Sequence, residues 1–119
     1  MIKAMILAAA ALTMSATAAD AQTMIEKNNI KVENHLMTPE ALWAMGRIGA
    51  AEASPNGKQV VYQVGYYSVK ENKGHQMLFI MDANGKNKKA LTTDAKSESD
   101  AAWIQGGQKI AFIRDGQLW

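Results

Sequence analysis

The sequence predicts an all-β fold built from repeated four-stranded antiparallel sheets. From Ala51 onward, short apolar runs alternate with turn residues, which is typical of strands joined by tight turns. One sequence pattern, a polar turn that ends in Gly and is followed by two polar residues and an apolar run, also occurs twice. Residues 54–64 read SPNGKQVVYQV, and residues 104–114 read IQGGQKIAFIR. The composition, with 48% hydrophobic and 20% charged residues, is that of a folded chain and too apolar for a disordered one.

Charge and cysteine content exclude several classes of function. The formal net charge is only +2, and the lysines are scattered through turns, so no basic stripe for nucleic acid is formed. The chain has no cysteine, which excludes a disulfide framework and a thiolate metal site. We therefore expect no nucleic-acid partner, no cofactor and no metal.

Residues 1–21 have the layout of a secretory signal peptide. Lys3 precedes an apolar stretch over residues 4–14, and small residues follow up to Ala21. The apolar stretch is about half of the ~20 residues that a membrane-spanning helix needs. We expect cleavage after Ala21, with Ala16-Thr17-Ala18 as an alternative site, and a periplasmic or secreted product. An alanine-rich helix of a cytosolic protein is the alternative.

Residues 22–50 are expected to form a polar leader and a short helix. The leader, residues 22–37, shows no sustained period, and we expect its His35 to be solvated. Thr38 can cap the helix, Pro39 suits the first helical position, and Glu40 complements the positive end of the helix dipole. Trp43 is expected to pack this helix on the body of the domain.

Residues 51–93 are expected to form the first complete sheet, an antiparallel meander. Its turns are Pro55-Asn56-Gly57 and Asn84-Gly85, in which Asn-Gly accepts the positive φ of a tight hairpin. The expected strands are residues 51–54, 58–65, 76–82 and 89–92.

A second sheet is expected to begin at about residue 99 and to be incomplete at Trp119. Its expected strands are residues 101–104, 109–113 and 117–119. When Gly57 is aligned with Gly107, Val60 falls on Ile110, Tyr62 on Phe112, and Ala53 on Trp103.

The spacing of this repeat points to a β-propeller. Gly57 precedes Leu78 by 21 residues, whereas Gly107 precedes Leu118 by 11, so the first copy carries an insertion of 10 residues and the underlying period is about 40. Four strands with this period are typical of propeller blades. Strands at 60–64 and 77–81 are apolar on both sides, and neighbouring blades would cover both faces. We expect residues 51–119 to be a partial propeller in the N-terminal piece of a longer protein.

Two longer stretches carry a resemblance to known families. The text SPNGKQVVYQV followed by LFIMDANGKNKKALT resembles the repeat of periplasmic Tol-type propellers and of the propeller domain of the prolyl oligopeptidase family of serine peptidases. The segments MTPEALWAMGRIGAAEASPNGK and YYSVKENKG resemble the start of the secreted bacterial dipeptidyl-peptidase 5 type of that family.

The resemblance implies a serine exopeptidase that releases dipeptides from the N-termini of short peptide substrates. Such enzymes join an N-terminal propeller, which gates substrate access, to a C-terminal α/β-hydrolase domain with a Ser-His-Asp triad. A homodimer is also compatible with it. This chain has no Gly-x-Ser-x-Gly motif, and we assign it no catalytic, cofactor-binding or metal-binding residue. The alternative is a non-catalytic periplasmic Tol-type propeller that binds a protein or cell-envelope partner.

A few polar residues remain as candidates for a site. Glu52 lies near the expected inner lining of the propeller, or exposed at its rim. His75, between Gly74 and Gln76 in the insertion, is expected to be a solvated loop residue. The insertion is expected to project and to contact the hydrolase domain or a neighbouring subunit, with a solvent-facing hairpin as the alternative. Its polar and aromatic residues are Tyr66, Tyr67, Lys70, Glu71 and Lys73, and the serines in polar or turn contexts are Ser54, Ser68, Ser97 and Ser99.

Overall fold

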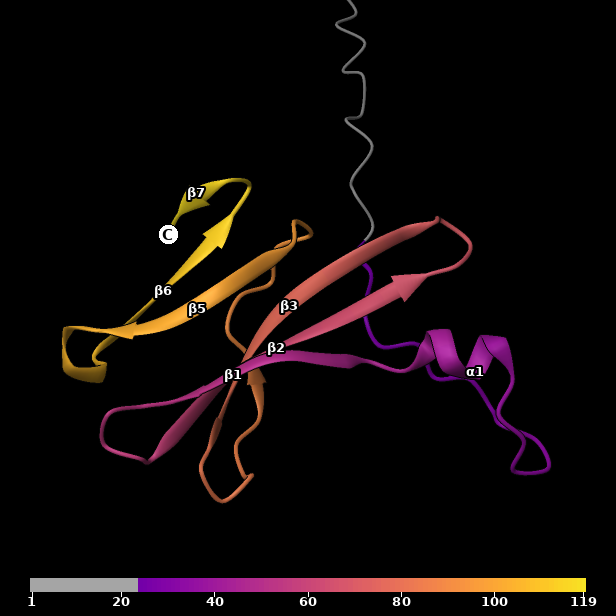
Figure 1. Ribbon diagram of the computed structural model, residues 1–119, viewed down its shortest axis with the longest axis horizontal. Helices are drawn as coiled ribbons and strands as arrows, with labels where there is room; N and C mark the ends of the chain where they lie inside the picture. The colour runs from indigo at the N-terminus through magenta and orange to yellow at the C-terminus, as the bar shows by residue number, and fades with distance from the viewer. Residues whose placement is uncertain (1–23) are drawn as a thin grey trace, which may run out of the picture.

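The computed structural model describes residues 24–119, which form two antiparallel sheets, one short α-helix and a 3-10 turn at Gln105–Gly107 (Figure 1). The first sheet has the order β1-β2-β3-β4 and the second the order β5-β6-β7. The all-β prediction is confirmed, whereas the predicted signal peptide lies outside the described residues. The strands are β1 (Arg47–Ala53), β2 (Gln59–Ser68), β3 (Lys73–Asp82), β4 (Lys89–Ala90), β5 (Glu98–Ile104), β6 (Lys109–Arg114) and β7 (Gln117–Leu118).

Helix α1 (Pro39–Ala44) begins where the capping residues predict. The backbone N–H of Ala41 donates to the hydroxyl of Thr38 over 3.1 Å, which satisfies one of the unpaired donors of the first turn. The helix ends at Ala44, and Met45 is already extended, so β1 can begin at Arg47. No helix among residues 24–119 is long and apolar enough to cross a membrane.

The two sheets repeat the same strand pairing. Ala53 pairs with Val60 in the first sheet, and Trp103 pairs with Ile110 in the second. One hairpin further on, Gln63 pairs with Leu78, and Ile113 pairs with Leu118. The first strand of each sheet also carries a register shift, between Ile48 and Ala51 in β1 and between Ser99 and Ala102 in β5. The alignment made from the sequence is therefore confirmed as an equivalence of register.

The insertion in the first copy lengthens a hairpin. In the second sheet the β6–β7 pairing ends at Arg114 and Gln117, whereas the β2–β3 pairing continues without a break to Ser68 and Lys73. The predicted ends of these strands, at Gly65 and Gln76, were therefore wrong. Ladder hydrogen bonds across the hairpin keep this polar and glycine-containing stretch extended.

Strand β1 also departs from the prediction, since it begins at Arg47 instead of Ala51. Its first residues pair with β2, because Arg47 lies opposite Gly65 and Ile48 opposite Val64. All seven residues of β1 are exposed, and β1 is an edge of its sheet. A bare edge strand of this kind is normally covered by another part of the protein.

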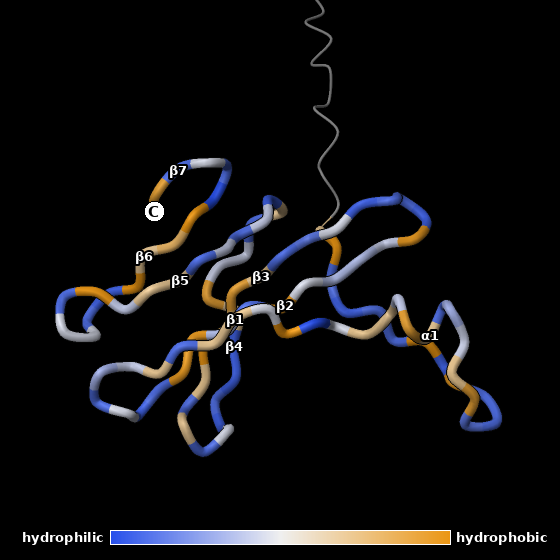
Figure 2. The backbone as a smooth tube through the Cα atoms, in the orientation of Figure 1, coloured by the Kyte–Doolittle hydropathy of each residue, from blue (hydrophilic) through white to orange (hydrophobic). Residues whose placement is uncertain are grey.

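The second sheet lies against the first through β5 (Figure 1). The indole N–H of Trp103 donates to the carbonyl oxygen of Glu52 in β1. The two equivalent turns also touch, since a Cβ atom placed on Gly107 would lie 3.0 Å from the Cδ atom of Pro55. Apolar segments concentrate on the strands, and hydrophilic segments on the turns between them (Figure 2). The buried apolar side chains in the sheets are Val61, Val64, Met77, Leu78, Ile80 and Phe112.

Candidate functional site: a groove between leader, helix and hairpin

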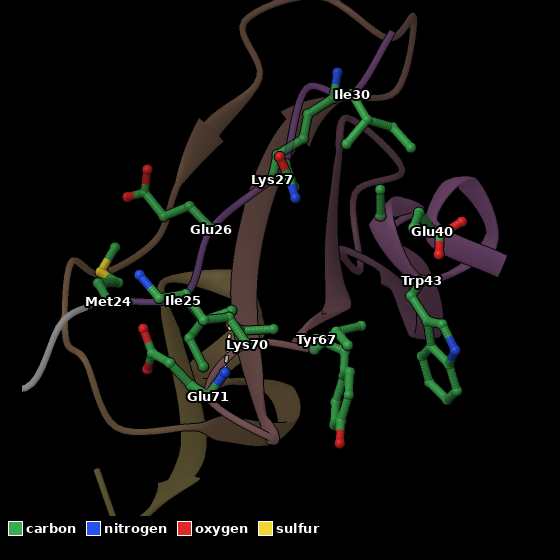
Figure 3. Close-up of a pocket in the computed structure, with 14 residues that line it drawn as sticks. Met24, Ile25, Glu26, Lys27, Ile30, Glu40, Trp43, Tyr67, Lys70 and Glu71 are labelled. Carbon is green, nitrogen blue, oxygen red and sulfur yellow. Dashed lines mark hydrogen bonds between the residues drawn. The ribbon is translucent and has the colours of Figure 1, made fainter. Parts of the chain in front are cut away.

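Three segments far apart in the sequence enclose an open groove of about 530 Å³ (Figure 3). The leader forms one wall, helix α1 a second, and the lengthened end of the β2–β3 hairpin a third. The leader, helix α1 and the lengthened hairpin end are the segments that the second sheet does not repeat, and all three line this groove. Its principal side chains are Ile25, Glu26, Lys27, Ile30, Glu40, Trp43, Tyr67, Val69, Lys70 and Glu71.

Aromatic contacts hold the hairpin end against the helix. The rings of Trp43 and Tyr67 lie 4.9 Å apart at an angle of 40°. The guanidinium of Arg47 lies 4.8 Å from the centre of the Trp43 ring, where the negative face of the indole attracts the positive charge. The hydroxyl of Tyr67 is also hydrogen-bonded to Asn72 at the turn of the hairpin. The prediction for Trp43 is confirmed only in part, because Trp43 packs on Tyr67 of the insertion and remains 41% exposed instead of lying on the body of the sheet.

The groove carries charges of both signs on an apolar floor. Glu26, Glu40 and Glu71 supply negative charge, while Lys27 and Lys70 supply positive charge. Beside the leader, burial raises the pKa of Tyr66, and electrostatic repulsion from Tyr62 and Glu26 raises it further.

His75 is buried in β3, so the prediction of a solvated loop residue was wrong. Its side chain is only 2% exposed, and both ring nitrogens face backbone carbonyl oxygens. The Nδ1 atom lies 2.7 Å from the oxygen of Ile25, and the Nε2 atom lies 3.3 Å from the oxygen of Lys96. The leader and the loop before β5 cover the ring. Because both nitrogens have backbone neighbours, His75 is not arranged as a general base.

The four candidate serines bond to nearby groups within turns and strands. The hydroxyl of Ser54 donates to Asn56, and that of Ser99 donates to Asp100. The hydroxyls of Ser68 and Ser97 accept from the backbone N–H groups of Glu71 and Gln76. These contacts shape the backbone. Among residues 24–119, no group of three or more His, Cys, Asp or Glu side chains could hold a metal ion.

The other predicted positions lie outside the groove. His35 is exposed in a turn of the leader, as predicted. Glu52 is exposed on β1, and its backbone carbonyl is the group that contacts the second sheet. Lys73 is exposed at the start of β3.

A charged cluster in the second sheet was not anticipated from the sequence. The guanidinium of Arg114 lies 2.8 Å from a carboxylate oxygen of Asp94 and 3.4 Å from one of Glu98. The Glu98 carboxylate also accepts a hydrogen bond from the hydroxyl of Thr92. Its side chain is 3% exposed, so Arg114 compensates a buried charge. No sequence motif pairs these residues, because a loop and two strands bring them together.

A comparison of sequences found two relatives of this chain. A protein named dipeptidyl-peptidase 5 from Porphyromonas endodontalis is 42% identical over 81 residues, which are 68% of this chain and 12% of that protein. A protein of the same name from Porphyromonas gingivalis is 32% identical over 100 residues, which are 84% of this chain and 14% of that protein. No protein-family model matches the chain. The chain is thus similar to one small portion of each of these two relatives.

Proposed function

We propose that this chain is the N-terminal part of the propeller domain of a larger, secreted dipeptidyl-peptidase of the prolyl oligopeptidase family. The observation that carries the proposal is the similarity, at 42% and 32% identity, to two proteins named dipeptidyl-peptidase 5. Because the aligned residues make up only 12% and 14% of those relatives, the catalytic residues are proposed to lie in another part of the protein.

The repeated sheets support the propeller within this proposal. The same pairing recurs at a spacing of 50 residues, and the inserted hairpin accounts for the excess over a period of about 40. The first strands of the two sheets are adjacent, and the equivalent turns at Pro55 and Gly107 touch. Side-by-side stacking of equivalent sheets is the packing of propeller blades. Apolar side chains now exposed, such as Ile48 and Ile104, would then contact neighbouring blades.

The reaction assigned to the whole protein is acyl transfer. The hydroxyl oxygen of a serine in the hydrolase domain attacks the carbonyl carbon of the second peptide bond, and a histidine oriented by an aspartate takes the hydroxyl proton. The histidine passes that proton to the leaving amine as the C–N bond breaks, and water then hydrolyses the dipeptidyl ester. The propeller is proposed to narrow the path to this centre, so that only the free ends of short peptides reach it. The lengthened β2–β3 hairpin is proposed to contact the hydrolase domain or a second subunit.

The test uses the intact gene product and two chromogenic substrates that differ only at the N-terminus. A dipeptide with a free amino group joined to a chromophore should be hydrolysed, and its N-acetylated counterpart should not. A serine-reactive fluorophosphonate should abolish the hydrolysis. Absence of hydrolysis over a panel of such dipeptides would contradict the proposal. If the intact gene product shows no hydrolysis but binds a cell-envelope protein, the non-catalytic propeller would be favoured.

Secretion is a separate part of the proposal with its own test. N-terminal sequencing of the mature protein from the periplasm or medium should begin at Gln22, or at Ala19 if the alternative site after Ala16-Thr17-Ala18 is cleaved. A cytoplasmic product that retains Met1 would contradict it.

A further inference from the structure

The two Asn-Gly pairs of this chain lie in turns of the same local geometry. Asn56-Gly57 joins β1 to β2, and Asn84-Gly85 lies between β3 and β4. In each turn the glycine has a positive φ, of 69° and 81°, and its N–H donates to the carbonyl three residues earlier, over 2.9 and 2.8 Å. The side-chain oxygen of each asparagine accepts from the N–H of the lysine two residues later, 3.0 Å away at Lys58 and 2.9 Å away at Lys86.

One contact distinguishes the two turns. The hydroxyl of Ser54 donates to the side-chain oxygen of Asn56 over 2.7 Å. Ser54 is only 6% exposed, and the N–H of Gln59 donates to the same hydroxyl over 3.0 Å, which directs the hydroxyl proton away from Gln59. The equivalent position in the other turn is Asp82, whose carboxylate can only accept. Among residues 24–119, the Asn56 side-chain oxygen thus has two donors and that of Asn84 has one.

These donors face the atom that becomes negative when an asparagine cyclises. The backbone nitrogen of the following glycine gives its proton to a base in the solvent and attacks the side-chain carbonyl carbon, so the carbonyl oxygen becomes an oxyanion. The C–N bond to the side-chain nitrogen then breaks, that nitrogen takes a proton and leaves as ammonia, and a five-membered imide remains. Water opens either carbonyl of the imide to give an aspartyl or an isoaspartyl residue.

We propose that Asn56 is a site of spontaneous deamidation, favoured over Asn84 by the hydroxyl of Ser54. This hydroxyl and the N–H of Lys58 form a two-donor site for the oxyanion of the cyclisation step. Glycine leaves room for the ring to close, since nothing lies within 4 Å of a Cβ atom placed on Gly57 or Gly85. The bond made by the glycine N–H opposes attack in both turns, so the hydroxyl decides between them.

The site lies beside the contact between the two sheets. Asn56 follows Pro55, whose Cδ atom would lie 3.0 Å from a Cβ atom placed on Gly107. The isoaspartyl product has a backbone one methylene longer than that of asparagine and carries a new negative charge. A change in the geometry of this turn therefore occurs where one repeat meets the next.

The test compares the two asparagines within one molecule. Peptide mapping by mass spectrometry follows the conversion of each amide to the acid while the intact gene product is held in a mildly alkaline buffer. Each rate is divided by that of a synthetic peptide of residues 51–61 or 79–89, which removes the effect of local sequence. The normalised rate should be about tenfold higher at Asn56, the effect of one hydrogen bond to a charged group. Equal rates, or faster conversion of Asn84, would overturn the proposal.

Variants at Ser54 separate the hydrogen bond from other effects of the fold. Ser54→Ala removes the donor, so conversion of Asn56 should slow about tenfold while Asn84 in the same molecule keeps its rate. Ser54→Thr supplies a hydroxyl again and should restore the rate. An unchanged rate at Asn56 in Ser54→Ala would overturn the proposal. Faster conversion would overturn it as well, because the hydroxyl would then restrain the turn instead of assisting the attack.

Discussion

The indole N–H of Trp103 lies 3.1 Å from the backbone carbonyl oxygen of Glu52 and donates a hydrogen bond to it. The bond joins the first strand of the second sheet to the first strand of the first sheet. Trp103 is the equivalent of Ala53 in the repeat, so the bond links neighbouring positions of consecutive copies. Together with the contact between Gly107 and Pro55, it orients one repeat on the next.

Replacement of Trp103 by Phe should loosen this contact between the sheets. The ring remains, but the hydrogen bond to Glu52 is lost, so the free energy of opening of β1 should fall by about 1 kcal/mol. Hydrogen exchange of the β1 and β2 amides in the intact gene product measures this free energy of opening. Glu52→Ala is the matched control, because it keeps the carbonyl and removes an exposed side chain. A loss of equal size in both variants would contradict the assigned role.

Replacement of Arg114 by Met should destabilise the second sheet strongly. It leaves the buried Glu98 carboxylate without its cation, which costs about 3–5 kcal/mol. The matched control is Lys96→Met, since the Lys96–Asp115 pair is exposed and such pairs contribute about 0–1 kcal/mol. Urea unfolding, followed at the β5 and β6 amides, should rank the two variants in this order. Equal effects would show that Arg114 does not compensate a buried charge.

Asp94 should make the stability of the same region fall in acid. The hydrogen bond from the backbone N–H of Lys96, followed by the charges of Arg114 and Lys96, lowers the pKa of Asp94 despite an opposing effect of desolvation. A carboxyl whose folded pKa is depressed stabilises the fold above its unfolded pKa, near pH 4. That contribution disappears as the pH falls through the folded pKa. The free energy of unfolding, measured from pH 6 to pH 2, should fall less in Asp94→Asn than in the unmodified protein. The same fall in both proteins would contradict this role of Asp94.

Shortening the β2–β3 hairpin should change the kinetics or the oligomeric mass of the whole protein more than the stability of the first sheet. Replacement of residues 67–74 by Asn-Gly joins Tyr66 to its partner His75 through a two-residue turn and removes the contact of Tyr67 with Trp43. Peptidase kinetics or oligomeric mass should change if the hairpin contacts the hydrolase domain or a second subunit. Trp43→Ala is the control for loss of the aromatic contact alone. Unchanged kinetics together with unchanged mass would leave the hairpin as a solvent-facing element.

Local signals in the sequence were sufficient to predict the turns and the alignment of the two repeats. Gly57, Gly85 and Gly116 all have positive φ in turns, and the apolar runs between such turns fix which residues pair. The burial of His75 could not be predicted in this way. It depends on Ile25, 50 residues away, and on a hairpin extension whose polar sequence looks like a loop. The Arg114 cluster likewise exists only after the loop at Asp94 has folded back on β6.

The central proposal is that each sheet is one blade of a propeller and needs neighbouring blades for its stability. Residues 22–119, produced alone, test it most directly, with size-exclusion chromatography to determine the mass and calorimetry to follow the melting. Because β1 and large side chains such as Ile48 and Leu118 are exposed, we predict self-association and no cooperative transition. A soluble monomer with a single sharp transition would contradict it.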